Sequence, residues 1–201
     1  MKGKGFLVVL TAPSGAGKTT IRDAILKKHP DFCYSISATT RKPRGNERNG
    51  RDYFFVSERK FGNMIDRGEL IEWQKVHSNF YGTPKKYLND MMLKGKIILL
   101  DIDIKGGINI KKMFPSAVFV FILPPSFKVL RKRLRERATD DEKTIALRLK
   151  NAEKEIKLIK YYDYLVINDE IKNAVSCVET LIRSEQMKIK RHERFIKGYL
   201  K

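Results

Sequence analysis

The chain has 201 residues, of which 42% are hydrophobic and 32% are charged, and its formal net charge is +19 at pH 7. This balance is typical of one globular domain with a sizeable core, and it excludes an intrinsically disordered chain. No apolar run approaches the ~18 residues of a membrane helix, so we expect neither a transmembrane span nor a signal peptide.

The excess of positive charge is compatible with nucleic acid or an acidic membrane surface as a partner. Lys and Arg are spread along the whole chain, however, which favours a solvated surface with a few arginines facing a small anion. Cys33 and Cys177 are far apart, which predicts free thiols in a reducing compartment. His29, His77 and His192 have no metal-ligand spacing. We therefore expect a cytoplasmic protein with no nucleic acid and no membrane partner.

A glycine-rich segment follows the first apolar run, residues 6–10, which predicts a buried strand. The segment has the P-loop pattern, in which glycines let backbone N–H groups point at phosphates and a helix beginning near Lys18 adds its positive end. Lys18 can reach the β- and γ-phosphates of a nucleotide, and the Thr19 hydroxyl can ligate Mg²⁺. The usual pattern opens with Gly, and Ala12 departs from it. The expected nucleotide-binding residues are Ala12, Pro13, Ser14, Gly15, Ala16, Gly17, Lys18, Thr19 and Thr20.

The next part of the chain changes character. We expect a helix over 19–28, then strands over 32–38 and 53–56 around a polar, glycine-rich loop. Ser57 is a suitable cap for a helix that runs to about Arg67, with Gly68 as its stop. Residues 69–73 come next, followed by a turn over 81–84 and a helix that ends by Gly95.

Further apolar strands are expected over 97–102, 117–123 and 164–167. Helices over about 105–113, 126–137, 141–161 and 171–197 fill the gaps. This alternation predicts an α/β fold with a parallel sheet covered on both faces. Segments 34–90 and 126–155 fit the alternation less well, which indicates insertions at the carboxyl ends of the strands, where ligands bind in such sheets.

Two carboxylates stand at the end of the strand over 97–102. In a P-loop protein, Asp101 is expected beside Lys18 and Thr19, where it helps to hold Mg²⁺ directly or through water. Strand periodicity turns Asp103 to the same side. One carboxylate of the pair can serve the metal and the other the second substrate, and the sequence leaves open which does which.

Two basic clusters complete the candidate chemistry. Arg41 and Arg44 flank a proline and can form bidentate hydrogen bonds to a doubly charged phosphate. The hydroxyls of Tyr53 and Tyr81 are further donors. Arg133 and Arg137 are four residues apart on one helix face, and Arg148 follows; such arginines can close over transferring phosphates. The alternatives are a solvated loop for the first cluster, and a solvated helix or a nucleic-acid-binding stripe for the second.

Taken jointly, these motifs resemble the guanylate kinase family over essentially the full chain. The matching stretches are 12–19, 37–44, 49–53, 71–73, 81–83, 100–103, 124–126 and 166–169. The resemblance implies a single domain with the three-layer P-loop NTPase fold and a mostly parallel central sheet. Within it, the resemblance implies a core (1–33, 91–125 and 156–201), an inserted mixed α/β GMP-binding lobe (34–90) and a helical lid (126–155).

The resemblance also implies an activity, transfer of the γ-phosphoryl group of ATP to GMP or dGMP, with Mg²⁺ as cofactor and no covalent intermediate. It assigns catalytic roles to Lys18, Arg133, Arg137 and Arg148, and a position near the adenine of ATP to Asn168. The implied contacts to the GMP phosphate are Ser37, Arg41, Arg44, Tyr53 and Tyr81. The implied contacts to guanine are Glu72 and Thr83, assisted by Asp101 or Asp103, and Gly82 is a further residue implied to bind GMP.

Three other functions compete with this interpretation. A catalytically silent guanylate kinase-like module would bind phosphopeptides, but Lys18, Thr19 and the lid arginines are intact. A P-loop kinase with another acceptor is disfavoured by Glu72 and Thr83, which suit guanine. The basic tail over 188–194 raises nucleic-acid binding, although an exposed helix end is the simpler interpretation. The sequence leaves a homo-oligomer open.

Overall fold

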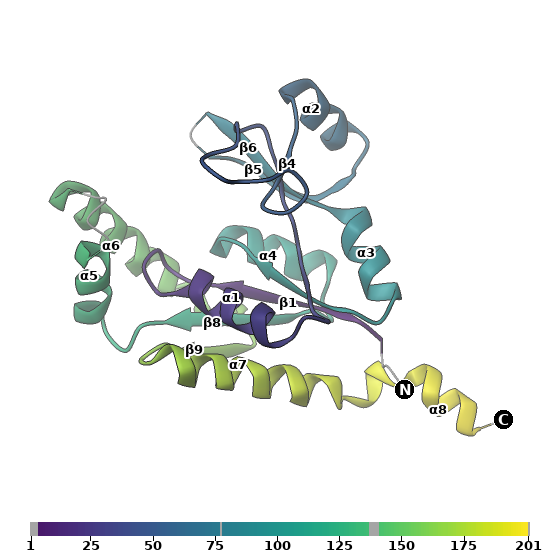
Figure 1. Cartoon of the computed structure of the whole chain (residues 1–201). Helices are drawn as coiled ribbons and strands as arrows, with labels where there is room; N and C mark the ends of the chain where they lie inside the picture. Colours follow the sequence, from purple (N-terminus) through teal and green to yellow (C-terminus); the bar gives the residue numbers. More distant parts are fainter. Residues whose placement is uncertain (1–3, 77, 137–140, 201) are drawn as a thin grey trace.

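The computed structural model describes residues 4–76, 78–136 and 141–200. Five strands form its central sheet: β1 (Phe6–Thr11), β2 (Cys33–Tyr34), β7 (Ile97–Asp101), β8 (Val118–Leu123) and β9 (Tyr164–Ile167). Their order is β2-β7-β1-β8-β9, and each neighbouring pair is parallel. The predicted α/β class with a mostly parallel central sheet is therefore confirmed (Figure 1).

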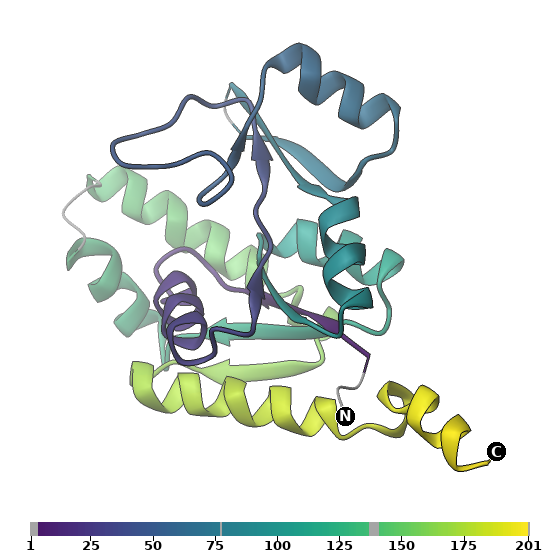
Figure 2. The ribbon, with the colours of Figure 1, turned by 45° about the vertical axis from the view of Figure 1, so that its right-hand side comes forward.

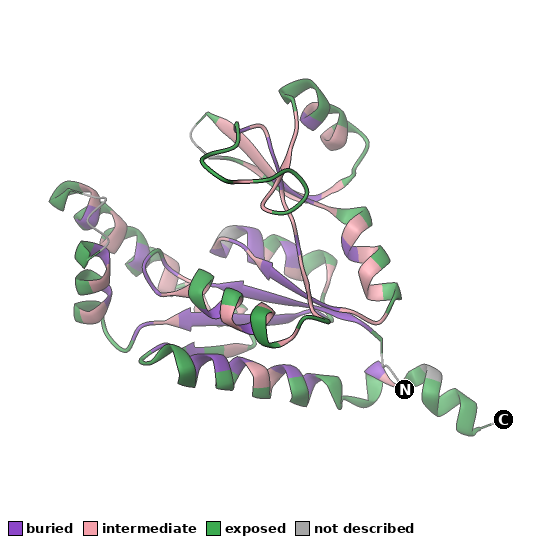
Figure 3. Ribbon diagram, in the orientation of Figure 1, coloured by how far each residue is buried: buried purple, intermediate pink, exposed green. Residues whose placement is uncertain are grey.

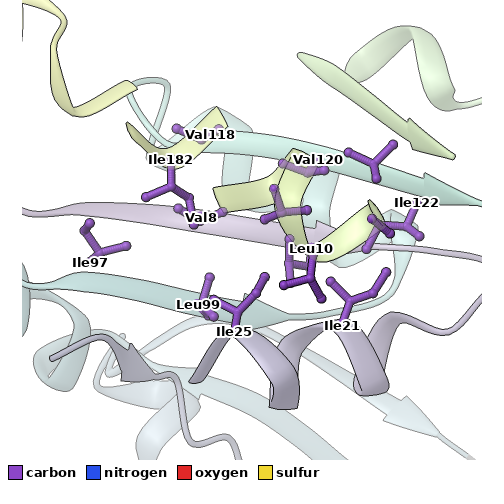
Figure 4. Close-up of a cluster of buried hydrophobic side chains, with 14 of the residues drawn as sticks. Val8, Leu10, Ile21, Ile25, Ile97, Leu99, Val118, Val120, Ile122 and Ile182 are labelled. Atoms are coloured by element: carbon purple, nitrogen blue, oxygen red, sulfur yellow. The ribbon is translucent and has the colours of Figure 1, made fainter. Parts of the chain in front are cut away.

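Helices cover both faces of this sheet. The helices α1 (Lys18–Lys28) and α7 (Ile171–Gln186) pack on one face, and α3 (Lys85–Leu93) and α4 (Ile104–Met113) pack on the other. Along β1, Val8 and Leu10 join the first layer, where Ile21 and Ile25 of α1 meet them (Figure 4), and Val9 joins the second. Strands buried on both sides are apolar at every position, which explains the continuous apolar runs of the sequence. The strands β1, β7 and β8 are accordingly the most buried part of the molecule (Figure 3), whereas the edge strand β9 is partly exposed.

A second sheet lies above the carboxyl ends of the first (Figures 1 and 2). Its strands are β3 (Ala38–Thr39), β4 (Phe54–Phe55), β5 (Leu70–Val76) and β6 (Asn79–Pro84), in the order β4-β3-β6-β5. The pair β3–β4 is parallel, whereas β3–β6 and β5–β6 are antiparallel. Helix α2 (Glu58–Asp66) is capped by Ser57 as predicted, and its Phe61 ring stacks on Phe80 of β6.

Two predictions in this region are wrong. The strand predicted over 32–38 is two short strands in different sheets, because the chain crosses from the central sheet to the second sheet between Tyr34 and Ala38. The turn predicted over 81–84 is part of β6. Gly82 pairs with Trp73 across the ladder, and a Cβ at Gly82 would lie 2.9 Å from the Leu70 side chain, so the glycine permits close packing rather than a turn.

Two helices follow β8 and pack against each other through a small apolar cluster of Leu130, Leu134, Ile145 and Ala152. They are α5 (Phe127–Glu136) and α6 (Glu142–Ile156). The helix predicted over 141–161 therefore ends earlier. A separate 3-10 turn over Ile159–Tyr161 follows, because the Asp163 N–H donates to the Phe119 carbonyl and the chain turns into β9. The boundaries proposed for a core, a lobe and a lid stay predictions.

The helix predicted over 171–197 is also wrong, because α7 ends at Gln186. A 3-10 turn (Ile189–Arg191) and the exposed helix α8 (Glu193–Tyr199) follow (Figure 1). The break is explained by Arg191, whose guanidinium returns to the Glu185 carboxylate at 2.9 Å and lies 3.7 Å from the centroid of the Phe6 ring. A continuous helix would carry Arg191 away from both. No helix within the described residues is long and apolar enough to cross a membrane.

The Glu185 carboxylate yields a stability prediction. Burial opposes its charge, but hydrogen bonds from Lys188, Tyr164 and Arg191 lower the pKa of Glu185 to about 2. A depressed pKa stabilises the fold above the unfolded value of 4.5, and this stability is lost as the pH falls toward about 2. We expect Glu185→Gln to lower the free energy of unfolding at pH 7 by about 3 kcal/mol, because Arg191 keeps a buried charge without its partner.

The measurement is urea unfolding between pH 7 and pH 2. In that acid range, the Glu185→Gln variant should lose less stability than the wild type. The matched control is Glu193→Gln, at an exposed glutamate of the same segment. A Glu185→Gln variant as stable as the wild type at pH 7 would contradict the prediction.

Candidate active site

The predicted P-loop connects β1 to α1. Gly15 and Gly17 both have φ of +91°, in the left-handed region that favours glycine. The Ala16 N–H donates to the Pro13 carbonyl (3.1 Å), which closes the turn, and Gly17 caps α1. Because Lys18 is the first residue of that helix, the loop directs backbone N–H groups and the positive end of α1 toward one place.

Lys18 meets Asp101 at the carboxyl edge of the central sheet. The register of β1 and β7 places Leu10 opposite Asp101, so the carboxylate stands beside the start of the P-loop. The Lys18 ammonium forms an ion pair with Asp101 and donates to the Ile102 carbonyl at 2.9 Å. The Asp101 side chain is only 11% exposed, because a second cation, Arg22, pairs with its other oxygen at 3.0 Å.

Asp103 has different partners. The strand ends at Asp101, and Asp103 caps helix α4, accepting from the Gly106 N–H at 2.8 Å. Its other oxygen accepts from the Gln74 amide of β5. Because the strand ends at Asp101, strand periodicity does not set the direction of Asp103, although both carboxylates line the same cavity. Asp101 contacts the P-loop lysine, whereas Asp103 contacts the second sheet.

Glu72 and Thr83 lie together on that sheet. Glu72 and Gln74 are two apart on β5 and share a face, and the Thr83 hydroxyl donates to Glu72 from β6 at 2.7 Å. Burial raises the pKa of Glu72 to about 7; the hydrogen bond from Thr83 opposes this, and the charge of Asp103 adds to it. This corner presents acceptor oxygens and fits a ligand edge that carries N–H donors.

Arg41 is the centre of a third group. Its guanidinium binds both oxygens of Glu47 at 2.9 Å, and its Nε donates to the Tyr81 hydroxyl at 3.2 Å. The guanidinium also lies 5.3 Å from the centroid of the Tyr53 ring. Arg44 is exposed, and its backbone N–H donates to Glu47 at 2.8 Å. The hydrogen bonds to Glu47 are the main cause that raises the pKa of Arg41 above its usual value, so the guanidinium stays positively charged.

One cavity of about 850 Å³ lies between Lys18, Glu72 and the two tyrosines beside Arg41, a volume within the range of small-molecule sites. Arg41, Arg44 and Thr83 are not among its lining residues. Its lining comes from α1, from the carboxyl edge of the central sheet and from the second sheet. The predicted site residues in the lining are Lys18, Thr19, Ser37, Tyr53, Glu72, Tyr81, Gly82, Asp101 and Asp103. The residues that the sequence analysis missed there are Arg22, Asp23, Leu26, Tyr34, Glu47, Arg51, Asp52, Gln74 and Ile102.

Two of the three arginines predicted for the lid, Arg133 and Arg148, have partners in the core. Arg148 of α6 donates to the Ser14 hydroxyl at 3.0 Å, and Arg133 of α5 donates to the Asp169 carbonyl at 3.1 Å. Leu134 of α5 packs on Gly15, where an added Cβ would lie 2.9 Å from its side chain. The third predicted arginine, Arg137, lies outside the described residues.

Asn168 hydrogen-bonds to the backbone of the P-loop. Its side chain is fully buried, and its Nδ2 donates to the Ala16 carbonyl at 2.7 Å. A Cβ at Gly17 would lie 2.3 Å from the same nitrogen. The resemblance implies a place near adenine for Asn168, whereas in this structure its amide hydrogen-bonds to the loop backbone.

The oxygen donors beside Lys18 fit Mg²⁺. Thr19 offers a hydroxyl and Asp101 a carboxylate, and hard oxygen ligands of this kind suit Mg²⁺, which takes few protein ligands and keeps water or phosphate oxygens. Within the described part of the chain, no group of three or more His, Cys, Asp or Glu side chains is placed to hold a metal ion. An ion here would therefore depend on nucleotide phosphates for its remaining ligands.

A P-loop at the carboxyl edge of a parallel sheet, facing an arginine–tyrosine cluster across one cavity, is typical of P-loop kinases, which bind a phosphoryl donor and an acceptor side by side. Similarity to known proteins identifies the family within this class. The guanylate kinase family model matches residues 4–185, and the chain belongs to that family.

Proteins that are similar to this chain over nearly its whole length are guanylate kinases. The chain is 47% identical over 188 residues to a guanylate kinase of Carboxydothermus hydrogenoformans, covering 94% of this chain and 92% of the relative. It is 44% identical over 193 residues to one of Clostridioides difficile, with 96% and 94% covered. A crystal structure of guanylate kinase from Anaplasma phagocytophilum superposes with a TM-score of 0.75 at 35% identity, covering 95% of this chain and 90% of the other.

The position of Asn168 generates a prediction. In Asn168→Asp, a carboxylate oxygen replaces the Nδ2 donor and faces the Ala16 carbonyl in a buried place. We expect the affinity for ADP to fall about tenfold or more, since an unmade buried hydrogen bond costs ~1–3 kcal/mol. Isothermal titration calorimetry with ADP and, separately, with GMP measures the effect, and GMP affinity should stay within about twofold.

The control is Asp169→Asn, an amide–carboxylate exchange at the exposed neighbour. An Asn168→Asp variant that is folded and binds ADP as tightly as the wild type would show that the hydrogen bond to Ala16 does not support the loop.

Proposed function

We propose that the chain transfers the γ-phosphoryl group of ATP to GMP, and also to dGMP, giving ADP and GDP. The observation that carries the proposal is the shared cavity: its lining includes the P-loop lysine, the arginine–tyrosine cluster reaches it through Tyr53 and Tyr81, and Glu72 supplies an acceptor suited to guanine. Membership of the guanylate kinase family supports the same activity.

The donor half of the site is the P-loop, Ala12 to Thr20. Backbone N–H groups and the N-terminus of α1 bind the ATP phosphates, and Lys18 moves from Asp101 to the β- and γ-phosphates. Thr19 and Asp101 hold Mg²⁺, which when bound neutralises charge on the phosphates. Asn168 keeps the loop in shape through Ala16.

The acceptor half is formed by the second sheet and its loop. A Glu72 carboxylate accepts from N1–H and the 2-amino group of guanine, which adenine does not offer, and Thr83 and Asp103 complete that corner. The GMP phosphate binds Ser37, Arg41, Arg44, Tyr53 and Tyr81. Glu47 holds the Arg41 guanidinium beside the two tyrosines through both of its Nη atoms, so the phosphate competes with Glu47 for this cation.

Transfer is in line and needs no covalent enzyme intermediate. The lid arginines Arg133, Arg137 and Arg148 close over the transferring group and stabilise its charge in the transition state. Closure of the lid (126–155) and of the GMP-binding lobe (34–90) onto the core excludes water and aligns the acceptor oxygen. We propose the cytoplasm as the place of action, in agreement with the free thiols of Cys33 and Cys177.

The decisive experiment is a coupled ADP-release assay with ATP and Mg²⁺ against GMP, dGMP, AMP, UMP and CMP. We expect turnover with GMP and dGMP and little with the other acceptors. Comparable rates with AMP would contradict the assignment of guanine. No turnover with any acceptor, together with tight phosphopeptide binding, would favour a silent binding module instead.

The raised pKa of Glu72 predicts a pH dependence of GMP binding. Only the ionised carboxylate accepts from both guanine donors, so affinity should fall as the pH drops through about 7 and protonates Glu72. Binding is measured by calorimetry from pH 8.5 down to 6.5, above the second phosphate pKa of about 6. Glu72→Gln stays neutral, so its GMP affinity should be about 10- to 100-fold weaker at pH 8 and flat across this range. A wild-type profile as flat as that of Glu72→Gln would contradict the role of Glu72.

A further inference from the structure

Arg22 is a cation of the cavity that the proposed reaction does not use. It lies on α1 four residues after Lys18, so one helix face presents both cations to the same carboxylate. Lys18 pairs with one oxygen of Asp101, and Arg22 Nη1 binds the other at 3.0 Å. The same Nη1 donates to the Tyr34 hydroxyl at 3.1 Å, and the guanidinium carbon lies 4.7 Å from the centroid of the Tyr34 ring.

The arrangement matters because Lys18 must change partners. When a nucleotide binds, the Lys18 ammonium is needed at the β- and γ-phosphates and leaves Asp101. The Asp101 side chain is only 11% exposed, and a carboxylate that loses its partner in such a place is strongly destabilised. Arg22 can stay, because its side chain is only 18% exposed and is fixed by Tyr34 and by an ion pair to Asp23 at 2.7 Å.

We propose that Arg22 is a positioning residue for the metal site: it keeps Asp101 paired and correctly turned after Lys18 has moved to the phosphates, so that one Asp101 oxygen is available to Mg²⁺ or its water. Arg22 then acts on the nucleotide through Asp101 and does not contact a substrate. This inference rests on the proposed function, since it takes MgATP as the donor.

Tyr34 gives Arg22 a fixed place in the fold. It belongs to β2, next to β7, and the chain crosses to the second sheet directly after it. Burial raises the pKa of Tyr34 to about 12, so the phenol stays neutral and serves as an acceptor for Arg22. The Arg22 guanidinium is therefore fixed between α1, β2 and β7, the three elements that meet at the carboxylate.

Equilibrium binding of ADP with and without Mg²⁺ tests the inference, with Arg22→Met as the main variant. We expect the gain in ADP affinity on adding Mg²⁺ to fall about tenfold or more, the size typical when a side chain that orients a metal ligand is lost. Affinity for Mg²⁺-free ADP and for GMP should change less than about twofold. Arg22→Lys, which keeps the charge, should restore part of the Mg²⁺-dependent gain.

Two further variants serve as a charge control and as an independent test of the Arg22 network. Lys27→Met removes one charge from an exposed position of the same helix and should leave the Mg²⁺ effect unchanged. Tyr34→Phe keeps the ring beneath the guanidinium and removes only the hydroxyl, so we expect the Mg²⁺ effect to fall about two- to threefold, which tests the same network if Arg22→Met does not fold. An unchanged Mg²⁺ effect in Tyr34→Phe would contradict the role of this network.

Two outcomes would overturn the inference. If Arg22→Met keeps the wild-type Mg²⁺ effect, Arg22 does not position the metal site. If it weakens GMP or Mg²⁺-free ADP as strongly as MgADP, Arg22 binds a substrate directly. Turnover of GMP by the wild type tests the proposed function separately, so a normal Mg²⁺ effect in Arg22→Met of an active chain contradicts this inference alone.

Discussion

Parallel pairing of β1 with β7 places the Asp101 carboxylate beside the P-loop. In a parallel pair the carboxyl ends of both strands meet at one edge, and here the register sets Leu10 opposite Asp101. Apolar layers on both faces hold these strands, and a shift of one residue would turn Asp101 toward one of those layers. The ion pairs of Asp101 with Lys18 and Arg22 therefore depend on packing some distance from the chemistry.

Local sequence patterns predicted the features whose causes are local. The alternation of apolar strands and helices, the P-loop glycines and the Ser57 cap all depend on neighbouring residues, and the structure contains them. The errors fall where a distant contact decides. Residues 81–84 form a strand because β5 lies alongside, and α7 stops because Arg191 reaches Phe6 at the other end of the chain. Neither partner can be identified from the segment itself.

In the candidate site, too, residues in local motifs were predicted and most contacts between distant residues were not. The motif residues were found, and so was the pairing of Lys18 with Asp101. The further charged partners, Arg22 and Glu47, were not found, because a motif does not say what neutralises it. Arg22 carried a signal in its four-residue distance from Lys18 on one helix. Glu47 carried none, since its pairing with Arg41 depends on how the loop folds around Tyr53 and Tyr81. The separate partners of Asp101 and Asp103 likewise follow from where β7 ends and α4 begins.

These partners change what the net charge of +19 means for recognition. Lys18 and Arg41, two of the cations proposed to bind phosphate, each have a carboxylate partner, so the cavity does not attract anions as an open basic patch would. A phosphate must supply enough charge and the right geometry to compete for them. At the other corner, Glu72 and Asp103 are acceptors and disfavour a base edge that also presents an acceptor, as adenine N1 does. Under the proposed function, these two opposite requirements in one cavity select a phosphate joined to a base with N–H donors, which a simple excess of positive charge could not do.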